Sequence, residues 1–185
     1  MEKNLEKQSK RSFKIVVFGP ESTGKTTLAK QLSAHYNASY VPEYARIYAE
    51  AKHKKGEKLT AKDVMPIAEG QLQLEKVAAQ NRLLICDTDI LETITYARIY
   101  YPEYDLKNLE KYVSKNTADF YFLTYIDVPW KADGIRDLPN ERERAFSEFQ
   151  ATLKIYNQPH ILLMGNPTNR LNQAITAIDK LLANH

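Results

Sequence analysis

One stretch of this chain constrains its fold more than any other. Residues 19–26 read GPESTGKT and follow directly on the apolar run FKIVVF at 13–18. The stretch matches G-x-x-x-x-G-K-[ST], a pattern in which glycines let backbone N–H groups turn inward around phosphate oxygens. Leu28 and Leu32 follow at helical spacing, so a strand, the loop and a helix are predicted in that order. The helix N-terminus adds partial positive charge, which favours a bound phosphate.

The rest of the chain alternates in the same way. Four further apolar runs have strand character: ASYV (38–41), LLICD (83–87), FYFLTYI (120–126) and HILLM (160–164). Segments with helical spacing are 60–80, 89–100, 106–115, 141–156 and 167–183. Strands that alternate with helices predict a three-layer α/β fold, with a parallel sheet covered by helices on both faces.

Local signals refine one of these helices. Thr60 with Asp63 three residues later predicts a capped start for the segment 60–80. Pro66 and Gly70 weaken the helical prediction locally.

Composition sets broad limits. Hydrophobic residues make up 43% of the 185-residue chain, which suits a folded domain and is too high for a disordered one. We expect a charged tail at 1–12 and a single domain at 13–185. A net charge of +3 is too small to argue for nucleic-acid binding, and no apolar run reaches the roughly 18 residues that cross a membrane. Cys86 is the only cysteine, which favours a reducing, cytoplasmic location.

The loop supplies the nucleotide-binding candidates. They are Gly19, Glu21, Ser22, Thr23, Gly24, Lys25, Thr26 and Thr27. Lys25 is expected to reach the β- and γ-phosphates of ATP, and Thr26 to hold Mg²⁺ through its hydroxyl. Glu21 places a negative side chain in a loop that binds phosphate through backbone amides. We expect it to point away from the nucleotide, towards the acceptor or towards Arg136.

The carboxyl ends of parallel strands line the active site in such folds, which selects further residues. Asp87 ends a buried strand and is predicted to hold Mg²⁺ or its water. Asp89 either contacts substrate or caps the next helix, since aspartate is a favoured N-cap. Glu43, Tyr44 and Arg46 follow the second strand, where a carboxylate can bond a hydroxyl group. Glu43 and Arg46 are also compatible with a weak surface pair.

The long polar segment 127–144 follows the fourth predicted strand and carries Arg136, Arg142 and Arg144. A loop at this edge can close over nucleotide and bring arginines to the transferred phosphoryl group. The alternative is a solvated loop whose ERER run begins a helix. Trp130 either stacks on a ligand or packs against its neighbours.

Four pieces of the sequence, FGPESTGKTTLAKQL, VPEYAR, CDTD and VPWKADGIRD, occur in this order in one known family. They resemble the nicotinamide riboside kinase domain of the bacterial NadR type, over about residues 13–180. That family also carries a glutamate in its phosphate loop, in the form G-x-E-S-[ST]-G-K-[ST]. The glutamate at position 21 is therefore part of the resemblance.

The resemblance implies a P-loop kinase fold with strand order 2-3-1-4-5. It implies transfer of a phosphoryl group from ATP, with Mg²⁺, to the 5′-hydroxyl of nicotinamide riboside. Glu43 or Asp87 would take or orient the hydroxyl proton. Arg136, with Arg142 or Arg144, would stabilise charge on the phosphoryl group.

The resemblance also bears on partners and on the rest of the site. The expected partner is a small riboside, and a homo-oligomer is left open. The adenylyltransferase and DNA-binding segments of some family members do not fit in the 12 residues before residue 13, so neither activity is expected. Some members have an aromatic residue where this chain has Pro42, so Tyr44 or Tyr48 would have to stack on the nicotinamide. The segment GNPTNR (165–170) would lie along the adenine.

Two other functions fit the same motifs. The first is another nucleoside or nucleotide kinase on the same fold, with Arg46 and Arg98 as a clamp for an acceptor phosphate. The second is a regulatory ATPase that hydrolyses ATP without a small acceptor.

Overall fold

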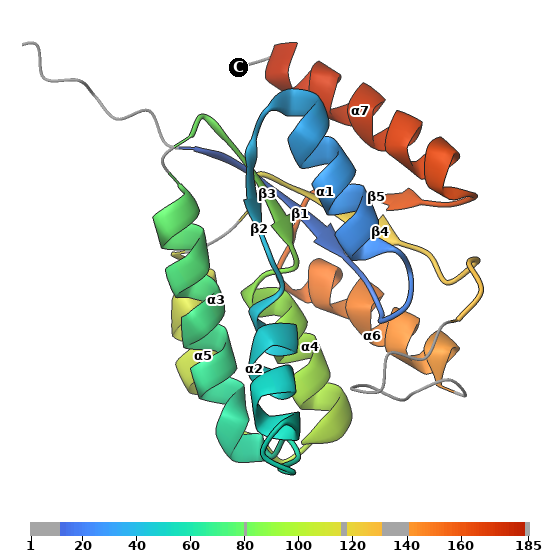
Figure 1. Cartoon of the computed structure of the whole chain (residues 1–185). Helices are drawn as coiled ribbons and strands as arrows, with labels where there is room; N and C mark the ends of the chain where they lie inside the picture. The colour runs from blue at the N-terminus through green and yellow to red at the C-terminus, as the bar shows by residue number, and fades with distance from the viewer. Residues whose placement is uncertain (1–11, 80, 116–117, 131–140, 184–185) are drawn as a thin grey trace, which may run out of the picture.

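The protein is built on a parallel β-sheet (Figure 1). The computed structural model describes residues 12–79, 81–115, 118–130 and 141–183. Within these ranges, five strands pair in parallel in the order β2-β3-β1-β4-β5. The strands are β1 (Phe13–Phe18), β2 (Ser39–Val41), β3 (Leu83–Asp87), β4 (Phe120–Thr124) and β5 (His160–Leu163). The expected order is confirmed, and each strand falls within a predicted apolar run.

Helices cover both faces of this sheet. They are α1 (Lys25–Tyr36), α2 (Tyr44–His53), the 3₁₀ helix η1 (Ala61–Asp63), α3 (Val64–Ala78), α4 (Ile90–Tyr100), α5 (Lys107–Val113), α6 (Arg142–Ile155) and α7 (Pro167–Ala183). Helices α1 and α7 pack together on one face, whereas α3, α4, α5 and α6 lie on the other (Figure 1). The predicted α/β class, with helices on both faces of the sheet, is therefore confirmed.

The strand β1 is apolar almost throughout because both of its faces are buried. Ile15 and Val17 pack into the cluster that contains the apolar side chains of α1 and α7. Val16 and Phe18 alternate with them and pack into the cluster formed with α3, α4, α5 and α6. Side chains of a strand alternate between faces, so a central strand between two helical layers must be hydrophobic at successive positions.

The predicted start of the segment 60–80 is confirmed in detail. Thr60 and Asp63 form a reciprocal capping box around η1. Pro66 lies in the first turn of α3, where its missing N–H costs no intrahelical bond. Gly70 is needed there because the Tyr44 ring packs on it: a Cβ at Gly70 would lie 2.0 Å from Tyr44 Cε1.

Helix α2 was not predicted from the sequence. Ala49 is the only fully buried residue of this helix. The helix contacts α3, and Figure 1 shows the two helices side by side.

No helix in the described part of the chain is both long and apolar enough to cross a membrane.

Candidate active site

The phosphate loop turns sharply out of β1, and Gly19 makes that turn possible. Its φ is +143°, and a Cβ there would lie 2.4 Å from Thr124 Oγ1 at the end of β4. Thr23 closes the loop, since its hydroxyl donates to the Pro20 carbonyl at 2.7 Å and lies 2.7 Å from Thr124 Oγ1. Gly24 then adopts a left-handed conformation as the N-cap of α1. The predicted strand–loop–helix arrangement is confirmed.

Lys25 lies inside this loop with only 6% of its surface exposed. Its ammonium group donates to the Pro20 carbonyl at 3.0 Å. The same nitrogen lies 3.3 Å from Glu92 Oε1, on the first turn of α4. The loop therefore holds a buried cation at its centre.

The side chains of Thr26 and Asp87 lie in contact, as expected for residues at the carboxyl ends of neighbouring parallel strands. The register of β1 and β3 pairs Val17 with Asp87, which brings the end of β3 next to the loop. The Thr26 hydroxyl donates to Asp87 Oδ2 at 2.6 Å. The Tyr40 hydroxyl donates to the same oxygen over a longer distance, 3.4 Å.

The carboxylate of Asp87 is suited to a divalent cation. It is almost fully buried, and its Oδ1 has no hydrogen-bond partner among the residues that the structure describes. Burial raises the pKa of this carboxyl, while Lys25 and the Thr26 hydroxyl counteract the rise. A hydroxyl and a carboxylate are the hard oxygen donors that Mg²⁺ prefers, with phosphate oxygens and water as its other ligands.

The residues predicted after β2 lie close to Asp87. Glu43 is buried, and its charge raises the pKa of the Asp87 carboxyl, whereas Arg46 lowers it. Arg46 Nε is 3.8 Å from Glu43 Oε2, but the arginine side chain is 40% exposed, so this ion pair is weak. The Tyr44 amide donates to Gln71 Oε1 at 2.8 Å.

Asp89 has an interior structural role, in line with the second of its two predicted alternatives. Its Oδ1 accepts the Leu91 amide at 3.0 Å, so it caps α4. Its Oδ2 accepts the Tyr121 hydroxyl at 2.5 Å and lies 3.7 Å from Lys14 Nζ. The side chain has no exposed surface, and both of its carboxylate oxygens already have partners in the interior. The alternative prediction, a helix cap, is the one confirmed.

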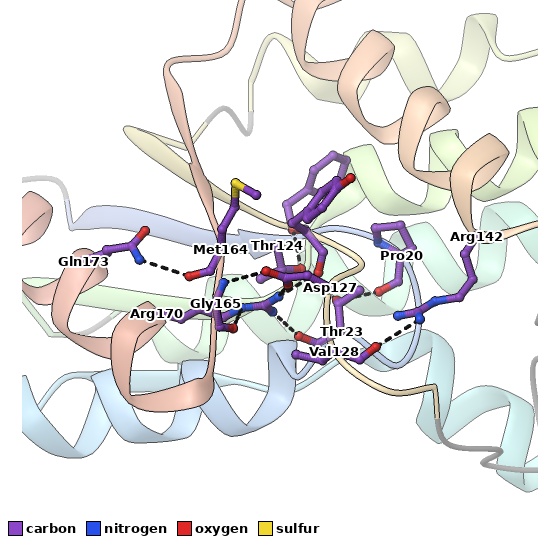
Figure 2. Close-up of polar contacts among 12 residues, drawn as sticks. Pro20, Thr23, Thr124, Asp127, Val128, Arg142, Met164, Gly165, Arg170 and Gln173 are labelled. Carbon is purple, nitrogen blue, oxygen red and sulfur yellow. Dashed lines mark hydrogen bonds and ion pairs between the residues drawn. The ribbon is translucent and has the colours of Figure 1, made fainter.

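The arginines after β4 differ in their positions. Arg142 extends from the start of α6 towards the loop side of the site, where Nη1 donates to the Val128 carbonyl at 3.0 Å (Figure 2). Its Nε and Nη2 are buried and have no hydrogen-bond partner within the described ranges. Arg144 is 63% exposed and pairs with Glu141 instead. Arg136 lies outside the described residues.

Trp130 is the last described residue before the gap at 131–140. It is half-buried, and its indole N–H has no hydrogen-bond partner in the part of the chain that the structure describes.

Sequence reasoning missed the residue that ties the two sides of the nucleotide site together. Arg170, on the first turn of α7, donates to the carbonyl oxygens of Thr23 at 2.6 Å and Tyr125 at 2.8 Å. It also donates to the Gly165 carbonyl at 2.9 Å and to a carboxylate oxygen of Asp127. Figure 2 shows this guanidinium at the meeting point of the phosphate loop and the segments after β4 and β5.

A sequence signal for this role did exist. Arg170, Ala174 and Ile178 recur at a spacing of four residues and are the buried residues of α7. An arginine in the buried stripe of a helix is rarely tolerated without several hydrogen-bond partners.

Residues of α2, α3 and α4 line a pocket of about 520 Å³. Its walls are mainly apolar, and Gln71, Thr88 and Glu92 supply polar groups at the end near β3. Neither Tyr44 nor Arg46 lines it, although Ala45 between them does. The size and lining are those of a site for a small organic ligand.

Known proteins resemble this chain over most of its length. A family described as an AAA domain matches residues 14–170. The trifunctional NAD biosynthesis/regulator protein NadR of Escherichia coli strain K12 is 29% identical over 143 residues, which are 75% of this chain and 34% of that protein. The NadR protein of Salmonella typhimurium is 28% identical over 70% of this chain and 32% of its own length. The chain thus spans about a third of the length of these curated relatives.

Solved structures share the fold. A NadR protein in complex with NR superposes with a TM-score of 0.80 at 24% identity, over 91% of this chain and 51% of that one. A deoxyadenosine kinase from M. mycoides with bound dATP has a TM-score of 0.62 at 15% identity, over 90% of this chain and 99% of that one. The fold is that of the P-loop kinases, and the chain belongs to the AAA-domain family that matches residues 14–170.

Proposed function

We propose that this protein is a kinase that transfers the γ-phosphoryl group of ATP to the 5′-hydroxyl of nicotinamide riboside, giving nicotinamide mononucleotide. The observation that carries this proposal is the phosphate loop itself, with Thr26 hydrogen-bonded to Asp87 and a pocket of about 520 Å³ lined by the adjoining Thr88. The similarity to NadR proteins, one of them solved in complex with NR, supports the choice of acceptor.

The nucleotide would bind across the loop. The backbone amides from Gly19 to Thr27 surround the phosphates, and Lys25 bridges the β- and γ-phosphates once it leaves the Pro20 carbonyl. The buried Arg142 donors that have no partner among the described residues lie on the same side of the site and would bind the phosphoryl group in transfer. Arg136 is proposed to assist from the adjoining segment.

Thr26 and Asp87 are the residues that would hold Mg²⁺, which shields phosphate charge when bound. Phosphoryl transfer asks the protein mainly for positioning and charge stabilisation. On the acceptor side, Glu43 and Arg46 are proposed to bind the ribose. Glu43 or Asp87 would orient the attacking hydroxyl group.

A second candidate is a kinase for another nucleoside. The likeness to a deoxyadenosine kinase, which this chain matches over 99% of that protein, favours it over a regulatory ATPase. Because both candidates share the loop and the pocket, they differ in the acceptor alone.

An acceptor panel tests the proposal. ADP formation is measured with ATP, Mg²⁺ and either nicotinamide riboside, the common nucleosides or their monophosphates, and the phosphorylated product is identified by mass spectrometry. We expect nicotinamide riboside to give the highest kcat/KM, and Lys25→Ala to abolish turnover while the protein stays folded. A higher kcat/KM with another nucleoside would replace the acceptor, and acceptor-independent hydrolysis would favour the regulatory ATPase.

A further inference from the structure

Glu92 occupies a position that neither the motifs nor the roles above explain. It lies on the first turn of α4, with 3% of its surface exposed. Its Oε1 is 3.3 Å from Lys25 Nζ, and the same side chain lines the pocket between α2, α3 and α4. A carboxylate is costly to bury, so its place between the phosphate loop and the pocket calls for a physical reason.

The polar groups around Glu92 define what the pocket offers a ligand. Gln71 is 2% exposed, and its Oε1 already accepts the Tyr44 amide at 2.8 Å. The other charged side chains along the pocket, His53, Glu57 and Lys58, are exposed residues. Glu92 is therefore the buried carboxylate of the described lining, and it is the lining residue that pairs with Lys25.

The reacting atoms must meet at this junction. Lys25 is the ligand of the γ-phosphate in the proposed function, and the pocket holds the acceptor. When ATP draws Lys25 to its phosphates, Glu92 gives up its ion pair with that lysine, and its Oε1 can then accept a hydrogen bond from another donor. A hydroxyl group of a bound riboside supplies such a donor at the same place.

We propose that Glu92 is an acceptor-binding residue whose carboxylate pairs with Lys25 in the nucleotide-free protein and accepts a hydrogen bond from a hydroxyl group of the acceptor once ATP has taken Lys25. This inference rests on the proposed function for the nature of the acceptor. In this arrangement the binding of ATP and the binding of the acceptor are linked, because the Glu92 carboxylate competes with ATP for Lys25 and then binds the acceptor.

Glu92→Gln tests the proposal through two measurements with opposite expected signs. The KM for the acceptor should rise roughly tenfold, because a charge-assisted hydrogen bond becomes a weaker neutral one. The affinity for a non-hydrolysable ATP analogue, measured without acceptor, should increase roughly twofold or more, since the side chain that competes for Lys25 loses its charge while the Pro20 carbonyl remains. Glu69→Gln, the same change on an exposed residue of α3, should alter neither value.

A purely structural role for Glu92 predicts weaker binding of both ligands, and this result would overturn the proposal. An unchanged acceptor KM would overturn it equally. Glu92→Asp, which keeps the charge, is the second variant if the glutamine variant does not fold, and it should show a smaller rise in acceptor KM. If the wild-type protein prefers another nucleoside, only the acceptor in the proposed function is replaced, and the two measurements are made with that nucleoside. If no acceptor is phosphorylated, both proposals fail.

Discussion

The strictest test of how the site is stabilised is the replacement of Arg170. Its guanidinium is almost fully buried and binds the carbonyl oxygens of Thr23, Tyr125 and Gly165 as well as Asp127. Removing one partner of a buried ion pair costs about 3–5 kcal/mol, because the remaining groups stay desolvated. Asp127 is 26% exposed, so water can solvate part of it, and we expect about 3 kcal/mol for Arg170→Met.

Urea unfolding at pH 7 measures this difference. Arg170→Lys keeps a charge but cannot reach three carbonyl oxygens from separate segments, so it should recover less than half of the loss. Arg144→Met is the matched control: its side chain is 63% exposed and pairs only with Glu141 among the described residues, so the change should stay within about 0.5 kcal/mol.

Arg170→Met should also affect nucleotide binding, since Arg170 binds the Thr23 carbonyl, which belongs to the phosphate loop. A double-mutant cycle that combines Arg170→Met with Asp127→Asn should give a coupling free energy of about 1–3 kcal/mol between the two residues.

Burial opposes ionisation of Asp127, but the Gly165 amide and Arg170 lower the pKa of its carboxyl below its ordinary value. The stabilisation from the ion pair between Asp127 and Arg170 is therefore complete at pH values above the pKa that Asp127 has in the unfolded chain. It is lost as the pH falls through the lower pKa that Asp127 has in the folded protein. A loss below about 1 kcal/mol for Arg170→Met would refute the reasoning.

Three further variants probe the site and its supports. Asp87→Asn should lower kcat at least about 100-fold in an ADP-release assay. It should not lower the thermal midpoint, because a buried carboxylate is replaced by a neutral side chain. Near-normal turnover would exclude Asp87 as the metal ligand. Burial opposes ionisation of Asp63, yet bonds from Lys52, Thr60 and Tyr48 lower its pKa to about 2. Its stabilisation should disappear between about pH 4 and pH 2 in acid titrations, and Asp63→Asn should remove that part of the pH dependence. Gly70→Ala should destabilise the protein by about 1 kcal/mol in urea, because crowding against Tyr44 outweighs helix propensity, and should stabilise it in a Tyr44→Ala background.

Much of the fold could be predicted because its signals are local. The runs at 13–18 and 83–87 are apolar at successive positions, as central parallel strands must be, and the loop pattern fixed the strand–loop–helix unit between 13 and 36. The meeting of Thr26 and Asp87 followed from the same rule, since parallel strands place their carboxyl ends at one edge of the sheet.

The surroundings of Asp89, Arg170 and Glu92 depend on packing between segments distant in sequence. Asp89 was equally compatible with a cap and a ligand until Tyr121 and Lys14 were found around its carboxylate. Arg170 acts through carbonyl oxygens, which carry no side-chain signature in a sequence.

The sequence by itself therefore determined the order of strands and helices along most of the chain and the phosphate loop, because apolar runs and glycine-dependent backbone turns are properties of short segments, whereas the order of the strands in the sheet came from the family resemblance. Only the tertiary structure decided which charged side chains lie at the phosphate loop, line the pocket between α2, α3 and α4, or lie in the interior. The reason is physical: the environment of a charged group is set by the groups within a few ångströms of it, and in this protein these come from different strands and helices.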